Sequence, residues 1–259
     1  MNNTLKVGTF NVRWANPGDG EHRWEYRFAR LCALLHDWSP DIVGLQEPLL
    51  PQLSDLRSAL PDYASVAVGR DDGVSAGEFC PLFYRASRFT RLDTGAFWFS
   101  ETPDVPGSRS WGCHHSRLCT WVHLEDNENG KRFRVYNLHW DHESQEAREN
   151  SGRLLRETLG SVAGPFIVLG DFNADSANPA IACLTAPGSP LTQSALSPEQ
   201  QREPGTFHGF TGTATEPPID HILLSPEWSV LSAEVLYGDG SRPFVSDHFP
   251  VAATLQLLH

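Results

Sequence analysis

The chain has 259 residues, of which 40% are hydrophobic and 20% charged, a composition typical of a globular protein with a sizeable core. Its formal net charge is −12 and only two of its twenty basic residues are lysines, so we do not expect the broad basic surface that binds long duplex DNA. The sequence has no run of 18 apolar residues, and its first six residues lack the apolar core of a secretory signal, so neither a membrane span nor export is expected.

The first part of the chain alternates short strands with one helix. Leu5 to Val12 and the short apolar run Asp41 to Leu45 are predicted strands. Between them, apolar residues recur at helical spacing, which predicts a helix with one apolar face formed by Trp24, Phe28, Leu31, Leu34 and Leu35. Pro40 ends this helix, because the residue before a proline avoids the α conformation.

The rest of the chain reads as further short strands and a second helix. Strands are predicted at Ala64–Val68, Phe79–Tyr84, Phe89–Phe97, Leu118–Leu124 and Arg132–Trp140. A helix from about Ser144 to Leu159 is followed by a buried strand, Phe166–Leu169, and by the Pro-, Ser-, Thr- and Gly-rich segment Leu184–Pro218, which is predicted to be loop. The last strands are predicted at Ile219–Leu224, Val230–Leu236 and Val251–Leu257. This pattern favours a layered α/β protein, and the lack of glycine-rich phosphate-binding motifs argues against a doubly wound nucleotide-binding fold.

The cysteines give an indication of the compartment. They are odd in number and include no C-x-x-C pair: Cys32, Cys80, Cys113, Cys119 and Cys183. This usage favours reduced, mostly structural thiols in a reducing compartment, so we expect a cytoplasmic protein.

Polar residues repeatedly stand where the predicted apolar strands begin or end. Asp171-Phe172-Asn173 follows one strand, and Ser246-Asp247-His248 precedes the last one. In isolation, an Asp-x-Asn after a strand is usually a turn or a helix N-cap, and a lone Asp-His is usually a surface pair. The repetition of the pattern in order along most of the chain favours one shared site.

The ordered motifs that carry this pattern are Phe10-Asn11, Gln46-Glu47, Asn137-Leu138-His139, Gly170-Asp171-Phe172-Asn173, Ile219-Asp220-His221 and Ser246-Asp247-His248. Together they resemble the signature of the endonuclease/exonuclease/phosphatase superfamily, which includes deoxyribonuclease I, apurinic endonucleases, neutral sphingomyelinases, inositol polyphosphate 5-phosphatases and deadenylases. The resemblance extends over about residues 7 to 256, and stretches such as Gly69–Gly73, Phe97–Pro103 and Arg117–Trp121 look like an uncharacterised bacterial subgroup. It implies a single domain over residues 1–259, folded as a deoxyribonuclease I-like, four-layer α/β/β/α sandwich of two mostly antiparallel sheets.

The resemblance also implies hydrolysis of phosphate esters with a divalent metal ion. This chemistry needs an activated water and neutralisation of the charge on the phosphoryl oxygens. Mg²⁺, or Mn²⁺ in its place, prefers carboxylate, amide and water oxygens. The matching positions assign the main metal contact to Glu47, with Asn11 and Asp247 close to it.

Four residues are expected to carry the reaction at the scissile phosphate. His248 would be the general base or would stabilise the phosphate, with Asp220 fixing the orientation of its ring. Asp171 and Asn173 would flank the phosphate, and Asp171 is the alternative base. The sequence does not decide between the two bases.

Further residues are expected around this centre. His139 would donate to a phosphoryl oxygen and Glu78 would hold it in place. Arg117 would bind phosphate or another anionic group, although a salt bridge at a strand end is an equal alternative. Trp140 would stack on a base or sugar together with other tryptophans, against the alternative that they pack in the core: Trp14, Trp98 and Trp111.

Other functions remain open at this stage. A small or soluble phosphate ester is the favoured partner because of the negative charge, and a nuclease acting on short single strands is the second hypothesis. Hydrolysis of a glycosidic bond on the same scaffold is a third, and a catalytically silent binding module a fourth. A zinc site built from His139, His142, His114 and His115 is disfavoured, because the oxygen-rich cluster explains more residues.

Overall fold

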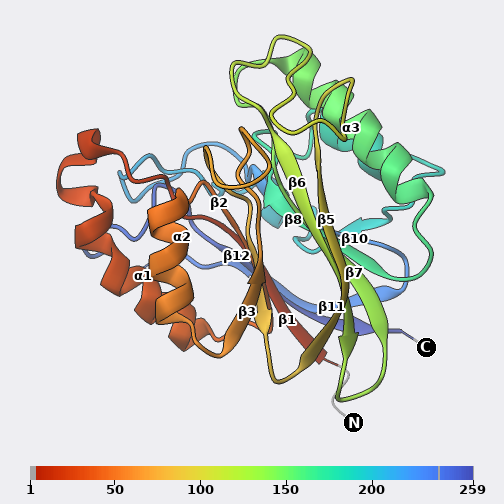
Figure 1. The fold of residues 1–259 in the computed structure, drawn as a ribbon, viewed down its shortest axis with the longest axis horizontal. Coiled ribbons are helices and arrows are strands. Elements are labelled where there is room, and N and C mark those ends of the chain that lie inside the picture. Colours follow the sequence, from red (N-terminus) through yellow and green to blue (C-terminus); the bar gives the residue numbers. More distant parts are fainter. Residues whose placement is uncertain (1–3, 239, 259) are drawn as a thin grey trace.

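Two six-stranded β-sheets lie face to face, and helices cover the outer face of each sheet (Figure 1). The computed structural model describes residues 4–238 and 240–258. The first sheet has the order β11-β12-β1-β2-β4-β3 and is formed by β1 (Thr4–Asn11), β2 (Ile42–Gln46), β3 (Tyr63–Val66), β4 (Leu82–Arg85), β11 (Trp228–Val235) and β12 (Val251–Leu257). The second has the order β5-β6-β7-β8-β10-β9 and is formed by β5 (Phe89–Trp98), β6 (Leu118–Asp126), β7 (Arg132–His139), β8 (Phe166–Asp171), β9 (Gln193–Ser194) and β10 (Asp220–Leu224).

Each sheet combines one parallel pair of strands with antiparallel neighbours. The parallel pairs are β1 with β2 and β7 with β8. The other described neighbours, such as β12 with β1 and β8 with β10, are antiparallel. The predicted four-layer α/β/β/α sandwich of two mostly antiparallel sheets is therefore confirmed.

A helix connects the two strands of each parallel pair, as a parallel crossover requires. Helix α1 (Trp24–Trp38) connects β1 to β2 and ends at Ser39, which is left-handed with φ 54° and precedes Pro40. Helix α3 (Gln145–Gly160) connects β7 to β8 and begins after Ser144, whose hydroxyl accepts a hydrogen bond from the Ala147 amide. These crossovers bring the carboxyl ends of β1 and β2, and of β7 and β8, to one edge of each sheet.

Three apolar layers hold the sandwich together. One lies between the sheets and contains side chains from both, such as Val7 and Val135. A second packs α1 and α2 (Leu50–Ala59) onto the first sheet, with Leu31 in the α1 contact. A third packs α3 and α4 (Pro179–Thr185) onto the second sheet, with Leu155 in the α3 contact. Each fully buried leucine contributes roughly 2 kcal/mol relative to an exposed one.

The structure differs from the predicted elements in a few places. Helices α2 and α4 were not expected, and short 3₁₀ helices occur at Pro17–His22 (η1) and Gln200–Arg202 (η2). The segment predicted as loop from Leu184 to Pro218 contains the end of α4, β9 and η2. The strand predicted from Phe79 begins only at Leu82, because Pro81 has no amide hydrogen to donate and Phe79 forms an isolated bridge with Gly69.

All five cysteines are free thiols. In the described part of the chain, no helix combines the length and the apolar character that a bilayer span requires.

Candidate active site

A cavity of about 460 Å³ opens where the carboxyl ends of the parallel strands of both sheets meet. Eight of the eleven predicted site residues line it: Glu47, Glu78, Arg117, His139, Asp171, Asn173, Asp247 and His248. Asn11 and Asp220 lie directly behind this wall and contact it. A larger cavity of about 730 Å³ lies beside α1 and the end of β11, but His248 is the only predicted site residue in its lining. The smaller cavity is therefore the candidate active site.

Unusual backbone geometry is concentrated at this cavity. Three lining residues other than glycine have positive φ: Arg13 at 56°, Glu47 at 73° and Asn173 at 47°. Such conformations cost on the order of 1–3 kcal/mol each and cluster at functional sites. Gly170 in β8 is needed for a different reason, since a Cβ atom there would lie 2.4 Å from the Leu138 carbonyl oxygen.

The first sheet contributes a fixed carboxylate. Glu47 follows β2 directly, and its two oxygens accept hydrogen bonds from the Asn11 side chain and the Trp14 amide, both at 3.0 Å. Burial raises the pKa of Glu47, but these hydrogen bonds and the charges of His248 and Arg13 outweigh it and lower the pKa overall. Glu47 is therefore ionised at neutral pH.

Asn11 joins the two halves of the cavity. Its side-chain NH₂ donates at 3.0 Å both to Glu47 Oε1 and to Asp171 Oδ2, which belongs to the second sheet. Its Oδ1 accepts the Arg13 amide at 2.9 Å. In this arrangement Asn11 positions the two carboxylates, and its own oxygen is already occupied. The prediction that Asn11 lies close to the metal ion stays a prediction.

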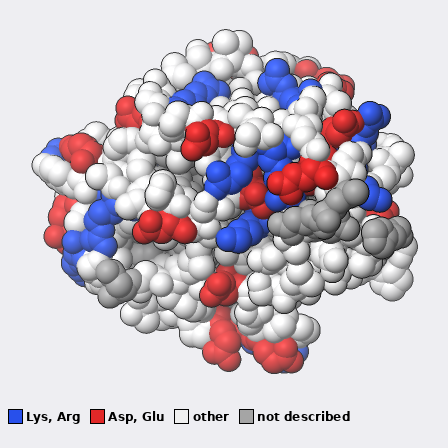
Figure 2. All heavy atoms as spheres, turned by 90° about the horizontal axis from the view of Figure 1, so that it is seen from below, with Lys and Arg blue, Asp and Glu red and all other residues white. Residues whose placement is uncertain are grey.

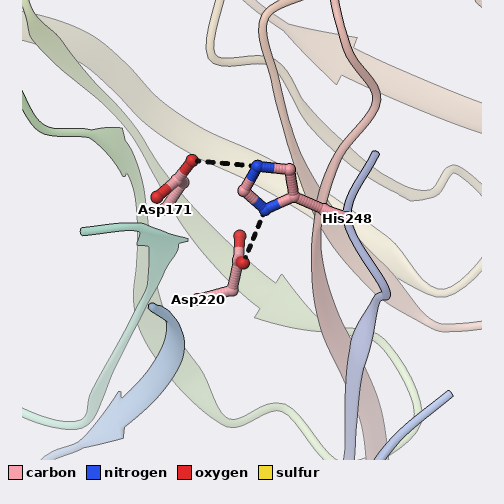
Figure 3. Close-up of side chains that lie close together, drawn as sticks. All are labelled: Asp171, Asp220 and His248. Atoms are coloured by element: carbon pink, nitrogen blue, oxygen red, sulfur yellow. Dashed lines mark hydrogen bonds and ion pairs between the residues drawn. The ribbon is translucent and has the colours of Figure 1, made fainter. Parts of the chain in front are cut away.

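In the second half of the cavity, one imidazole lies between two carboxylates (Figure 3). His248 Nδ1 is 2.9 Å from Asp220 Oδ2, and Nε2 is 3.9 Å from Asp171 Oδ2. Burial lowers the pKa of His248, but the charges of Asp220, Asp171 and Asp247 raise it to about 10. The ring is therefore an imidazolium at neutral pH, which suits charge stabilisation better than proton abstraction.

Asp171 has the properties of a base instead. Burial and the nearby Asp220 charge raise the pKa of Asp171 to about 7, while His248 and Asn11 act in the opposite direction. A carboxyl group that titrates near neutral pH can accept a proton from water. Of the two bases left open by the sequence, the geometry and charges favour Asp171.

His139 and Glu78 extend the cavity beyond Asp171. His139 Nε2 lies 3.6 Å from Asp171 Oδ2, and its Nδ1 lies 4.0 Å from Glu78 Oε2. Burial and the charges of Arg117 and Arg70 hold the pKa of His139 well below its usual value, so the ring is neutral. Burial and the Glu47 charge raise the pKa of Glu78 to about 7, although Arg70 donates a hydrogen bond to it.

The donor groups of the cavity fit a hard divalent cation. Glu47 and Asp247 present carboxylates from the first sheet, and burial and the Glu47 charge raise the pKa of Asp247 against the charges of His248 and Arg13. Asp171, Asp220 and His248 form a second group whose ligand atoms lie within 4.8 Å of one another and could hold a metal ion. In that second group the hydrogen bond to Asp220 already occupies Nδ1 of His248, whereas Asp220 Oδ1 has no hydrogen-bond partner among the described residues.

Trp140 does not contact the cavity, so its expected role in substrate binding is corrected. Its side chain is fully buried, with its ring centroid 4.8 Å from that of Phe172 and 6.1 Å from that of Phe99. Only its carbonyl group takes part in the site, because it accepts a hydrogen bond from the Asn173 side chain at 3.0 Å.

The histidines of the zinc hypothesis do not share one centre. His114 pairs with Glu143 at 3.2 Å, and His142 Nδ1 lies 2.9 Å from the Arg117 guanidinium. A neighbouring guanidinium disfavours a cation at His142.

Seven further residues line the cavity: Arg13, Trp14, Arg70, His115, His142, Phe207 and Ile219. Trp14 was among the tryptophans expected at a substrate pocket, and His115 and His142 were considered only for the disfavoured zinc site. Arg70 lies in one of the stretches typical of the bacterial subgroup, which was a usable signal. Phe207 lies in the segment predicted as loop, where no pattern marked it, and it reaches the site through a β-bridge with His248.

Comparison with known proteins identifies a family and solved structures that share this fold. The model of the endonuclease/exonuclease/phosphatase family matches residues 8–248. A crystal structure of an endonuclease/exonuclease/phosphatase from Bacteroides vulgatus is 36% identical, covers 98% of this chain and 99% of its own, and superimposes with a TM-score of 0.91. A mannosyl-6-phosphatase from Bacteroides thetaiotaomicron is 36% identical over 97% of this chain and 99% of its own, with a TM-score of 0.89. An uncharacterised protein of Acanthamoeba polyphaga mimivirus is 28% identical over 164 residues, and the match spans 60% of each chain. The chain belongs to the endonuclease/exonuclease/phosphatase family.

Proposed function

We propose that this chain is a divalent-metal-dependent phosphoesterase that hydrolyses small, soluble phosphate esters, and that residues 1–259 act as one catalytic domain. The observation that carries the proposal is the convergence of Asp171, His139 and His248 with the carboxylate of Glu47 on one cavity. The 36% identical relative described as a mannosyl-6-phosphatase supports a small phosphate ester as substrate.

Glu47 and Asp247 would hold Mg²⁺ or Mn²⁺, with Asn11 fixing the position of the Glu47 carboxylate. When bound, the ion supplies positive charge that neutralises the phosphoryl oxygens. The remaining chemistry belongs to the side chains of the second sheet.

Asp171 accepts a proton from the attacking water as the water oxygen bonds to phosphorus. The bond from phosphorus to the ester oxygen breaks, the leaving oxygen takes up a proton from solvent, and Asp171 returns its proton to solvent. The imidazolium of His248 and the neutral ring of His139 donate to the phosphoryl oxygens, and each lies within 4 Å of Asp171. General acid–base groups placed in this way accelerate such steps by roughly 10²–10⁴-fold.

A nuclease acting on short single strands is the second candidate, and one observation favours it. Phe207 is half-exposed, lines the cavity and lies with its ring centroid 5.1 Å from that of His248, so it can stack on a base. On the face shown in Figure 2, however, Lys and Arg side chains alternate with Asp and Glu and form no continuous basic band.

The test is hydrolysis by chelator-stripped protein of a panel of phosphomonoesters, phosphodiesters, short oligonucleotides and glycosides, with and without Mg²⁺ or Mn²⁺. We expect the metal to restore cleavage of small phosphate esters at least 100-fold, and Glu47→Gln to remove that gain, whereas the exposed Glu157→Gln control keeps it. Preferential cleavage of oligonucleotides would select the second candidate. Cleavage of glycosides in excess chelator, with no phosphate ester cleaved, would refute the proposal.

A further inference from the structure

Two loops that are far apart in the sequence, residues 69–78 and 99–117, interlock and form one wall of the cavity. The indole nitrogen of Trp98 donates to the Arg70 carbonyl at 2.6 Å, and the Ser116 hydroxyl donates to Asp71 at 2.7 Å. Gly107 packs so closely that an added Cβ would lie 2.3 Å from the Asp71 carbonyl oxygen. The wall is therefore a fixed structure, and it presents four side chains to the cavity: Arg70, Glu78, His115 and Arg117.

Arg117 stands out among the arginines of the cavity. The guanidinium of Arg13 is hydrogen-bonded to Asp19, and that of Arg70 to Glu78. Arg117 is 4% exposed and, among the described residues, makes no hydrogen bond to a carboxylate. Its Nε is 3.9 Å from Asp141 Oδ2, which is too long for a hydrogen bond, and it has no other partner there.

The guanidinium is nevertheless held in a defined orientation. Arg117 Nη2 lies 2.9 Å from Nδ1 of His142, a contact that requires this ring nitrogen to be unprotonated. Since Nη2 is engaged and Nε is buried, Nη1 remains to donate to a group in the cavity. A buried cation with a free donor that lines a cavity fits an anionic partner.

The strand order places this donor beside the reaction centre. Arg117 precedes β6, β6 pairs with β7, and β7 carries His139 next to Asp171 at the end of β8. Neighbouring strands are about 4.8 Å apart, so the backbone of Arg117 lies roughly 10 Å from that of Asp171. This separation allows the guanidinium to face the organic part of a substrate whose phosphate lies at Asp171.

We propose that Arg117, supported by His142 and by the wall that carries Arg70, forms a subsite for a second anionic group on the organic part of the phosphate ester. This inference rests on the proposed function and deepens it, because it narrows the substrate class to phosphate esters that also carry a carboxylate or a second phosphate.

The experiment uses two pairs of esters that differ in the second anion. Glucitol 6-phosphate is compared with 6-phosphogluconate, and fructose 6-phosphate with fructose 1,6-bisphosphate, in the metal-loaded protein. We expect kcat/KM to be at least 10-fold higher for the ester that carries the second anionic group, in at least one of the two pairs. Arg117→Gln should reduce kcat/KM for the ester with the second anion at least 10-fold more than kcat/KM for its partner ester, mainly through KM, while Arg117→Lys retains part of the preference. Arg109→Gln, in the same loop but exposed, should change neither member.

A second measurement needs no variant, in case Arg117→Gln does not fold. Free gluconate should inhibit hydrolysis of glucitol 6-phosphate competitively, at concentrations where free glucitol does not. Equal kcat/KM within both pairs, or an equal loss on both members in Arg117→Gln, would overturn the subsite and leave the proposed function intact. Failure to hydrolyse any of the four esters with metal present would overturn the proposed function and, with it, this inference.

Discussion

At the carboxyl end of the second sheet, His248 is held by Asp220 on one side and faces Asp171 on the other. The two carboxylates have different partners, since Asp171 also accepts hydrogen bonds from Asn11 and the Asn173 amide, whereas Asp220 binds the ring. We infer that Asp220 acts through His248, by fixing its ring and its positive charge.

Replacing Asp220 by Asn should therefore lower kcat by about 10²–10³-fold, because the ring loses both its orientation and the charge that keeps it protonated. The exposed Asp93→Asn control should retain full activity. Imidazole nitrogen resonances of His248 provide a direct reading, since they should change in Asp220→Asn at neutral pH. Unchanged resonances and unchanged kcat would show that Asp220 has only a structural role.

Most site residues could be predicted from sequence because their motifs stand next to strand ends. Asp171 and Asn173, for example, follow a strand that contains an obligatory glycine. The role of Trp140 was predicted wrongly because the sequence does not distinguish a tryptophan in the core from one at a cavity. Only its packing against Phe172 in the structure shows which it is. That Arg13 lines the cavity could not be predicted from sequence, because no motif marked it and its backbone has a positive φ.

Among the elements, helix α2 is one that the spacing of apolar residues did not predict. It has ten residues with Pro51 in its first turn, where proline is tolerated, and Leu53 and Leu56 are its buried apolar contacts. So short a pattern does not distinguish a helix from a loop. The long helices α1 and α3 repeat their apolar spacing over several turns and were predicted from it.

The short helix η1 is joined to two distant loops through His22. Its ring stacks on Phe210 with centroids 4.5 Å apart, and its Nδ1 accepts the Phe244 amide at 3.2 Å. Burial lowers the pKa of His22, and Arg242 and Arg27 act in the same direction against the charge of Glu21. The unfolded chain therefore takes up a proton at this site more readily than the folded one, so the stability contributed by His22 falls as the pH drops below its ordinary value of 6.5.

The difference in free energy of unfolding between the native chain and His22→Gln should consequently shrink between pH 7.5 and pH 5.5. Denaturant titrations at each pH measure it, and His36→Gln, an exposed histidine of α1, is the matched control. A difference that stays constant or grows at low pH would contradict the assignment of His22 as a neutral, buried ring.

On the scale of the whole molecule, Asn137 joins the two sheets. Its side chain lies on β7, donates to the carbonyls of Leu45 at 2.7 Å and Pro81 at 2.9 Å, and accepts from Gln46 at 2.7 Å. Gly44 makes room for it, because a Cβ there would lie 2.6 Å from the Asn137 side chain. The sequence marked Asn137 only as part of a motif, and this contact between sheets required the assembled sandwich.

Asn137→Ala should lower the free energy of unfolding by about 3 kcal/mol, because three buried polar groups each lose one hydrogen bond. It should also lower kcat/KM by roughly 10²-fold, since small displacements of catalytic groups have effects of that size. Chemical denaturation and steady-state kinetics test both, with Asn150→Ala, a partly exposed position in α3, as control. Loss of stability without loss of activity in the folded fraction would show that the alignment of the sheets does not depend on Asn137.

The two parallel strand pairs have a further consequence for how the protein is organised. Each sheet holds one strand–helix–strand unit, β1-α1-β2 or β7-α3-β8, and each unit directs a polar residue from its first strand and a carboxylate from the end of its second toward the same cavity. Asn11 and Glu47 come from one unit, and His139 and Asp171 from the other. In the proposed reaction the first unit binds the cation and the second unit transfers protons. The proposed reaction therefore needs groups from both strand–helix–strand units, and it would take place where the two sheets meet.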